Sequence, residues 1–237
     1  MPNLRIIHTN ALTFVGGSAT HPTMNDYKSQ TSTGSSFALS FTPLSGQIAI
    51  VAYLPEHTGS ITMTAQGFLP DVTESTVSST TSLPNAYGGG KYVVLYMTIT
   101  TRTTFTINFS ASVKVSRFII GNYWSPVHNI PFGITTGYTD TTTSERLQSG
   151  DLYSTPGPRN KTMQFELQYL TDSDKYQFFS ILKSVGKLGS IFVSAFPQDA
   201  DKELEQMFSI YGKMTNLNAI TYAQYTRYAT SVELEEF

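Results

Sequence analysis

The most ordered part of the sequence is residues 161–211, which read KTMQFELQYLTDSDKYQFFSILKSVGKLGSIFVSAFPQDADKELEQMFSIY. In its first part, Met163, Phe165, Leu167 and Tyr169 alternate with polar residues. This period of two is the pattern of a strand that buries one face. The sequence therefore predicts a strand here, with Tyr169 on the buried side.

A helix is predicted directly after this strand. Thr171 starts the sequence Thr-Asp-Ser-Asp, in which a hydroxyl N-cap and first-turn carboxylates complement the free N–H groups and the helix dipole. Gly186 stands where a helix C-cap requires positive φ. The apolar residues at helical spacing between them are Phe178, Ile181, Leu182 and Val185. Two short apolar runs, residues 191–196 and 207–211, predict strands after the helix.

The first half of the chain is β-rich and carries almost no helix signal. Short runs of alternating apolar and polar residues are separated by Gly and Pro turns about every ten residues, which is typical of an antiparallel β-sandwich. The predicted strands are residues 4–8, 37–41, 47–53, 61–65, 92–97, 103–109 and 113–120. Residues 70–84 are rich in Ser and Thr and are predicted to form a long loop.

These patterns predict a mainly β fold with one principal helix, divided into two domains. Residues 1–121 form an antiparallel β-sandwich, and residues 122–237 form a second β domain with a flanking helix. The boundary is placed near Asn122, because the carboxylates concentrate after it. A closing strand is predicted within residues 219–237, where Tyr228, Thr230, Val232 and Leu234 share one face.

Composition excludes several classes of function. The chain of 237 residues has no cysteine, which excludes disulfides, thiolate chemistry and Cys-ligated zinc. A formal net charge of −2 argues against a binder of nucleic-acid backbone. No apolar run approaches the about 20 residues of a membrane span, so no membrane insertion is predicted. Charged residues make up only 14% of the chain, which is typical of a surface covered by neighbours or by glycan.

No catalytic residue, metal site or cofactor is predicted, and the chain is not expected to be an enzyme. The four histidines lack the spacing of metal ligands; they are His8, His21, His57 and His128. The acidic run at residues 199–205 lacks the ligand spacing of a calcium loop, and it predicts a solvated segment with a short helical turn. An enzyme hypothesis is kept open only as a glycan hydrolase, which needs two carboxylates across a cleft. The acids of the first half are scattered; they are Asp26, Glu56, Asp71 and Glu74.

Several motifs in the second half occur together. They are SRFIIGNYWSP at residues 116–126, TTTSER at 141–146, Gly150-Asp151, Gly157-Pro158-Arg159, the apolar run at 191–196, and Ile210-Tyr211-Gly212. In this combination the chain resembles the distal-tail or minor tail-tip proteins of long-tailed bacteriophages and gene-transfer agents. The resemblance implies that residues 122–237 form a ring-forming domain related to the tail-tube fold. It also implies that the first half is a galactose-binding-like or jelly-roll sandwich.

The function implied by this resemblance is structural. A protein of this class is a virion component of the tail tip or baseplate, assembled in the host cytoplasm as a homo-oligomer, a hexameric ring around the tail axis. Its other partners are the tail tube and the tail-hub or fibre proteins that recognise the host. The interface is expected along the strand–helix–strand domain and the irregular, Pro-stiffened loop of residues 144–160. The candidate ring-interface residues in that loop are Glu145, Arg146, Asp151 and Arg159.

A carbohydrate-binding module for host-surface glycans is the alternative. Aromatic rings near strand ends can stack on sugars or bury against a protein partner. The candidate contacts are Tyr53, Tyr87 and Trp124. Affinity of a monomer for an oligosaccharide would favour this alternative over the ring.

Overall fold

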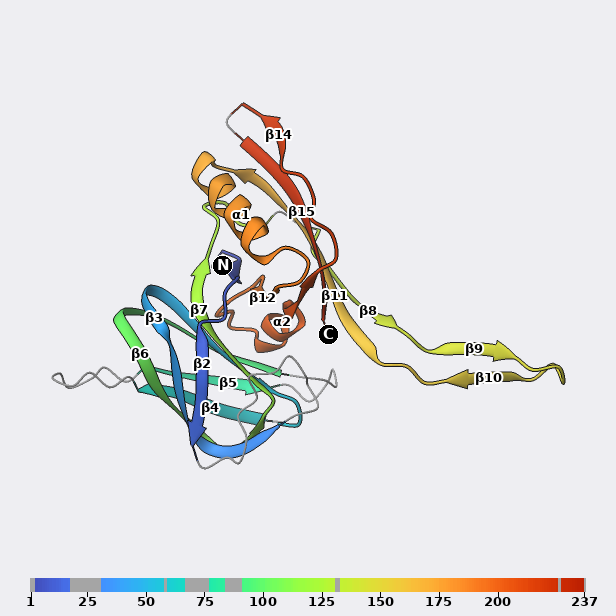
Figure 1. The fold of residues 1–237 in the computed structure, drawn as a ribbon, viewed down its shortest axis with the longest axis horizontal. Helices are drawn as coiled ribbons and strands as arrows, with labels where there is room; N and C mark the ends of the chain where they lie inside the picture. The colour runs from blue at the N-terminus through green and yellow to red at the C-terminus, as the bar shows by residue number, and fades with distance from the viewer. Residues whose placement is uncertain are drawn as a thin grey trace. The chain divides into compact units, whose positions relative to one another are not determined.

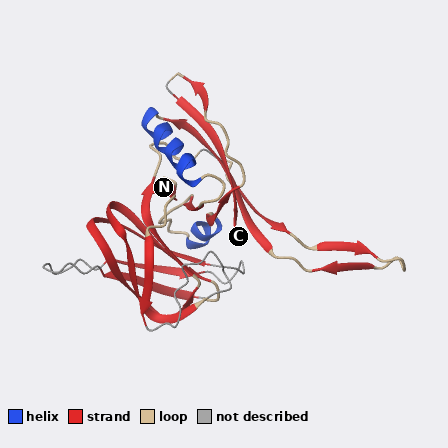
Figure 2. Ribbon diagram, viewed as in Figure 1, coloured by secondary structure: helices blue, strands red, loops and turns tan. Residues whose placement is uncertain are grey.

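The computed structural model describes residues 3–17, 31–57, 59–66, 77–83, 91–130, 133–225 and 227–236. The predicted mainly β fold with few helices is confirmed (Figures 1 and 2). The chain forms two compact units. Unit 1 consists of Met1–Pro126 and Ile191–Ser209, and unit 2 consists of Val127–Ser190 and Ile210–Phe237. The chain first passes from unit 1 to unit 2 after Pro126, whereas the sequence placed a single boundary near Asn122. The return of residues 191–209 to unit 1 was not predicted.

Unit 1 contains a sandwich built around two long strands. Its elements are β1 (Arg5–Ile7), β2 (Leu12–Gly17), β3 (Ser32–Leu54), β4 (Gly59–Gln66), β5 (Val77–Leu83), β6 (Lys91–Val115), β7 (Arg117–Trp124), most of β12 (Ser190–Ser194) and α2 (Lys202–Met207). The strand order is β5-β4-β6-β3-β7-β1-β12, and β2 also pairs with β3. The pairing of β3 with β6 is antiparallel along their whole length. A ribbon this long must bend and change register to enclose one core.

A change of register near Leu44 makes both halves of β3 face the same core. Phe37, Leu39 and Phe41 point inward before it, at odd positions, whereas after it the even positions do. The inward residues of the second half are Ile48, Ile50, Ala52 and Leu54. One inserted residue reverses which side chains face inward, because the side-chain period of a strand is two. The two strands predicted at residues 37–41 and 47–53 are therefore one continuous strand, as are those predicted at 92–97 and 103–109.

The long loop predicted at residues 70–84 is partly a strand. β5 covers Val77–Leu83 and pairs with β4 from Gly59↔Leu83 to Ala65↔Val77. Its Ser and Thr residues lack the apolar alternation by which a strand is recognised, and an edge strand does not need it. The rest of that predicted loop lies outside the described residues.

The segment of unit 1 after β12 packs on the edge of the same sheet. The rings of Tyr92 and Phe192 are 5.3 Å apart between centroids. The Gln206 side chain accepts a hydrogen bond from the Tyr92 backbone N–H at 2.8 Å and donates another to the Tyr92 carbonyl. The helical turn predicted in the acidic run is confirmed as α2, for which Asp201 is the N-cap. The prediction that the whole acidic run is solvated is wrong for Glu205, which is buried and pairs with Lys202 at 2.8 Å.

Unit 2 is a small sheet with one helix and a separate hairpin. Its elements are β8 (Thr135–Asp140), β9 (Thr143–Arg146), β10 (Leu152–Thr155), β11 (Arg159–Leu170), α1 (Asp172–Val185), β13 (Ser209–Met214), β14 (Thr221–Gln224) and β15 (Arg227–Glu236). The sheet order is β13-β15-β11-β8, β14 pairs with β15, and β9 pairs only with β10. The closing strand predicted within residues 219–237 is therefore the hairpin β14–β15.

The predicted helix is confirmed at both ends. Thr171 and Asp174 form a capping box, in which the Thr171 hydroxyl accepts from the Asp174 N–H and the Asp174 carboxylate accepts from the Thr171 N–H. Gly186 has a φ of +56° and donates its N–H to the Leu182 carbonyl. The core-facing residues of α1 are Phe178, Ile181 and Val185.

The prediction that Tyr169 is buried is wrong. Met163, Phe165 and Leu167 do face the core, but the side chain of Tyr169 is 49% exposed and Leu170 is buried in its place. The pairing with β15 changes register between Leu167 and Leu170, and Tyr169 has a φ of +58°. A β-bulge of this kind shifts the following residue to the other face.

The close approach of β7 to Thr9 gives a test of this fold. A Cβ at Gly121 would overlap the Thr9 carbonyl oxygen, whereas one at Gly137 in β8 would meet only the Thr162 hydroxyl at 3.6 Å. We expect Gly121→Ala to destabilise the chain by about 1–3 kcal/mol, the typical cost of overpacking. Gly137→Ala is the matched control and should change stability far less. Urea unfolding followed by far-ultraviolet circular dichroism, which reports on the strands of both units, measures both variants; equal midpoints for the two variants would contradict the close approach of the two backbones.

Candidate functional site

Exposed large apolar side chains are concentrated in unit 2. Among the described residues they are Val127, Tyr138, Leu147, Leu152, Tyr153, Tyr169, Tyr176, Phe179, Leu188, Met207, Leu217, Tyr222 and Tyr225. All of these except Met207 belong to unit 2. Exposed apolar surface of this density marks interaction sites more often than scattered single residues do. Seven of these twelve residues of unit 2 lie in two places, three on a projecting hairpin and four in a groove beside α1.

The hairpin, called the arm here, consists of residues 141–158. It carries β9 and β10, and it extends away from the rest of unit 2 (Figure 1). Every residue of β9 and β10 is exposed, and among the described strands they pair only with each other. An isolated two-stranded hairpin is marginally stable in water. A partner that covers the arm would stabilise it.

Backbone contacts at both ends of the arm hold it together. At the base, the Thr141 N–H donates to the Pro158 carbonyl at 3.2 Å, and the Gly157 N–H donates to the Thr142 hydroxyl at 3.2 Å. At the tip, the Leu147 N–H donates to the Asp151 carbonyl at 2.9 Å. These bonds fix the shape of the arm without a hydrophobic core.

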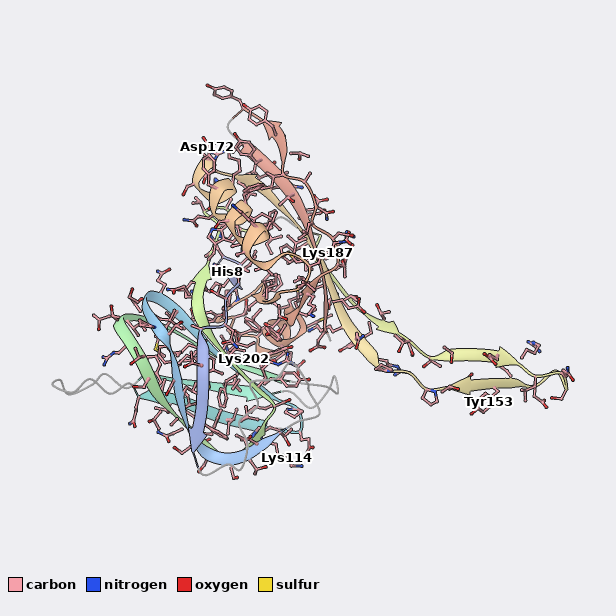
Figure 3. The ribbon with its side chains drawn as sticks, viewed as in Figure 1. His8, Lys114, Tyr153, Asp172, Lys187 and Lys202 are labelled. Carbon is pink, nitrogen blue, oxygen red and sulfur yellow. The ribbon has the colours of Figure 1, made fainter. Side chains whose placement is uncertain are left out.

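The two faces of the arm differ in charge. β9 and β10 pair with Glu145 opposite Tyr153 and Arg146 opposite Leu152. Because opposite residues of an antiparallel pair share a face, Glu145 and Tyr153 lie on one side together with Thr143 and Thr155, and we call this side the acidic face. The other side carries Ser144, Arg146, Leu152 and Ser154. Figure 3 shows the Tyr153 side chain on the arm, standing off the ribbon.

The groove lies between α1 and the segment that leads into β14 and β15, and it has a volume of about 770 Å³. Its lining residues are Lys175, Tyr176, Phe179, Leu182, Lys183, Leu217, Asn218, Ala219, Ile220, Tyr222 and Tyr228. The Asn218 side chain holds the second wall in place, because its amide donates to the Ser231 hydroxyl at 2.8 Å. The groove is therefore a formed, largely apolar surface that is open to solvent.

The charge at the groove is positive. Lys175 and Lys183 line it, and no carboxylate does. The ammonium of Lys175 lies 4.0 Å above the Tyr228 ring and 3.1 Å from Asp172. Interaction with the Tyr228 side chain and with Asp172 raises the pKa of Lys175, so it stays protonated. No ion pair in the described part of the chain engages Lys183.

A polar cluster in unit 1 has a structural role. The Arg5 guanidinium lies 4.0 Å from the ring centroid of Tyr96 and 4.7 Å from that of Tyr123. It also donates to the Gln198 side chain at 3.0 Å. Burial raises the pKa of the Tyr96 hydroxyl, which stays neutral. The cluster ties β1 to β6, β7 and residue 198.

The structure places three of the residues predicted for a ring interface near the tip of the arm; they are Glu145, Arg146 and Asp151. It does not bring Arg159 to them, because Arg159 lies at the base of the arm, where it pairs with Asp140. The aromatic residues predicted to contact glycan are placed differently, since Tyr53 and Trp124 are buried, at 5% and 7% exposure. Tyr87 lies outside the described residues. Tyr53 packs on Tyr92, with ring centroids 5.1 Å apart, so its face is not open to a sugar.

Sequence reasoning missed the groove, although part of its signal was present. Tyr176 and Phe179 form a second apolar stripe on α1, beside the core stripe that includes Phe178. A helix with one buried face needs only one such stripe. The second wall comes from residues 217–228, so the groove exists only in the folded chain.

Known chemistry and known proteins add no assignment to these surfaces. Across the described ranges, no group of three His, Asp or Glu side chains could hold a metal ion. Neither α1 nor α2, the helices of the described chain, is long and apolar enough to cross a membrane. No protein-family model and no curated protein matches the sequence, and no solved structure matches the chain.

The base of the arm gives a test by titration. Hydrogen bonds from the Thr142 side chain and N–H, together with the Arg159 guanidinium 3.0 Å away, lower the pKa of Asp140 from 3.8 to about 2. Since the folded value is depressed, the stability that Asp140 contributes is present above its ordinary pKa and is lost as the pH falls toward about 2. We expect Asp140 to be mostly ionised at pH about 3 in the wild type, and protonated to a greater degree in Thr142→Ala. Carboxyl NMR measures this, with Arg146→Ala as a control that leaves Asp140 unchanged; an ordinary titration in the wild type would refute the described contacts.

Proposed function

We propose that the chain is a structural protein that assembles with copies of itself into a closed ring. Its setting is the tail tip of a long-tailed bacteriophage or gene-transfer agent, where it acts as a distal tail protein and adaptor. The ring links the tail tube to the tail-hub or fibre proteins of the host-recognition apparatus. The resemblance of residues 116–212 to this class supplies the setting and the expectation of six copies.

The observation that supports self-assembly best is the arm. Its strands are entirely exposed, its side chains include Leu147, Leu152 and Tyr153, and it is held in a fixed shape by backbone bonds. A structured projection with uncovered apolar residues is suited to reaching a neighbouring subunit. The low content of charged residues, 14%, also favours a chain whose surface is covered in an assembly.

A ring requires a heterologous interface, in which two different surfaces of one chain meet and the rotation between copies closes. The concentration of exposed apolar residues in unit 2 makes that unit the self-associating part of this proposal. The carbohydrate-binding alternative needs solvent-facing rings. Two of its three candidate aromatics, Tyr53 and Trp124, are buried, so the assembling role is the one developed here.

Assembly should depend on the arm. We expect the purified chain to form closed rings with a central channel, seen by electron microscopy, with a mass by light scattering of several copies of 26.1 kDa. Tyr153→Ala should weaken assembly by about 30-fold, because an aromatic hot spot contributes about 2 kcal/mol or more to an interface. Its thermal unfolding should not change, because the Tyr153 side chain is 59% exposed.

The matched control is Met207→Ala, which removes an exposed apolar side chain from unit 1 and should leave assembly as it is. Assembly that is equally insensitive to both substitutions would argue against the arm as the contact. A strict monomer at high concentration that binds an oligosaccharide on a glycan array would instead support the carbohydrate-binding alternative.

A further inference from the structure

We propose that the groove beside α1 receives the acidic face of the arm from a second copy of this chain. This inference rests on the proposed self-assembly and names the surface that the arm contacts. Four observations support it. They are the positions of the arm and the groove relative to β11, the apolar side chains of both surfaces, the charges of both surfaces, and the side chains of Glu145 and Lys183, which have no ionic partner in the described part of the chain.

Arm and groove lie at opposite ends of the same strand. The arm leaves β11 at Arg159, whereas Leu170 at the other end pairs with Tyr228, which lines the groove. A strand of 12 residues spans about 36 Å at about 3.3 Å per residue. The arm also points away from the rest of unit 2 (Figure 1). The arm therefore cannot fill the groove of its own chain, but head-to-tail copies can bring the two surfaces together.

The apolar parts of the two surfaces match in kind. The groove exposes Tyr176, Phe179 and Tyr222, each with 60–69% of its surface accessible. The acidic face of the arm presents Tyr153, which is 59% exposed, and the adjoining tip presents Leu147, which is 51% exposed. Tyrosine and phenylalanine are enriched at interface cores, where their large rings supply most of the buried area. Docking of the arm would bury both apolar sets at once.

The charges of the two surfaces are opposite. The acidic face carries Glu145, and Asp151 lies at the adjoining tip of the arm, while the groove carries Lys175 and Lys183 and no carboxylate. Arg146, the only cation on β9 and β10, lies on the other face of the arm and donates to the Gly150 carbonyl at 2.9 Å. Charge complementarity therefore selects one face of the arm and sets its orientation in the groove.

The side-chain contacts within one copy indicate which ion pair can form between two copies. Asp151 accepts from the Ser149 hydroxyl at 2.9 Å, and Lys175 is held by Asp172 at 3.1 Å. Within the described part of the chain, no ion pair engages the side chain of Glu145 or that of Lys183. The Glu145 carboxylate of one copy thus pairs with the Lys183 ammonium of the next, beside Tyr153.

Cross-linking in the full-length chain tests this docking, because the sequence contains no cysteine to interfere. One preparation carries Thr155→Cys on the acidic face of the arm and another carries Ala219→Cys in the wall of the groove, so that the Tyr153 and Phe179 rings stay in place. The mixture is treated with a short bismaleimide, and we expect a cross-linked dimer of the two variants. The matched control replaces Thr155→Cys by Ser154→Cys, which lies on the opposite face of the same arm and should give roughly fivefold less product, since adjacent strand residues face opposite ways. Equal yields from both pairs would overturn the proposal.

A charge exchange tests the ion pair separately. Lys183→Glu should weaken assembly by about tenfold, the size typical of a close interfacial charge pair, and Glu145→Lys in the same chain should restore it. The control combines Lys183→Glu with Glu166→Lys, since Glu166 is an exposed acid of β11 that lies away from the arm. This second change should not restore assembly. Light scattering measures assembly in each case, and a failure of Glu145→Lys to restore it would overturn the pair.

Failure of this inference is distinguishable from failure of the proposed function. Rings that are seen by electron microscopy without a cross-link between residues 155 and 219 would overturn docking in the groove and leave self-assembly standing. A chain that stays monomeric and gives no cross-link would overturn the docking and count against the ring as well.

Discussion

The antiparallel pairing of β11 with β15 is the constraint on which unit 2 depends. Met163 pairs with Leu234 and Phe165 with Val232, and all of these side chains are buried. A slip of one residue would turn this whole set to solvent, so the register is strongly specified. The same strand then positions everything else in the unit. Its first residue, Arg159, follows directly after the arm, and its last residue, Leu170, leads through Thr171 into α1.

In unit 1 as well, the register of strand pairing decides which side chains are buried. The strands β3 and β6 are too long to remain flat, and they enclose a core only by changing register near Leu44. The single inserted residue near Leu44 keeps apolar side chains facing inward on both halves of the bend. Phe37 illustrates the result, because it contacts both Phe109 and Phe118, at centroid distances of 5.9 and 5.2 Å. One bent ribbon thus supplies most of the sandwich core.

Local periodicity predicted the mainly β class, the helix with its Thr171 and Gly186 caps, and most strands, because the signals for these lie within a few residues. Local periodicity did not predict the features that depend on pairing between strands far apart in the sequence. β3 continues through Pro43 and Gly46 because β6 supplies a partner along its length. Tyr169 leaves the buried face because of a bulge that alternation does not reveal. At the candidate site, irregular composition located Glu145, Arg146 and Asp151, but it could not reveal the groove, whose walls are far apart in sequence.

The second apolar stripe of α1 bears on why unit 2 would need a partner. Tyr176 and Phe179 contribute nothing to the core that Phe178, Ile181 and Val185 form, and their positions would accept charged residues without loss to the monomer. Exposed aromatic residues also raise the risk of non-specific association. A chain with two such surfaces at opposite ends of one strand limits that risk if each surface covers the other in the next copy. Closure of the ring leaves neither exposed, whereas an open chain of subunits always leaves one of each.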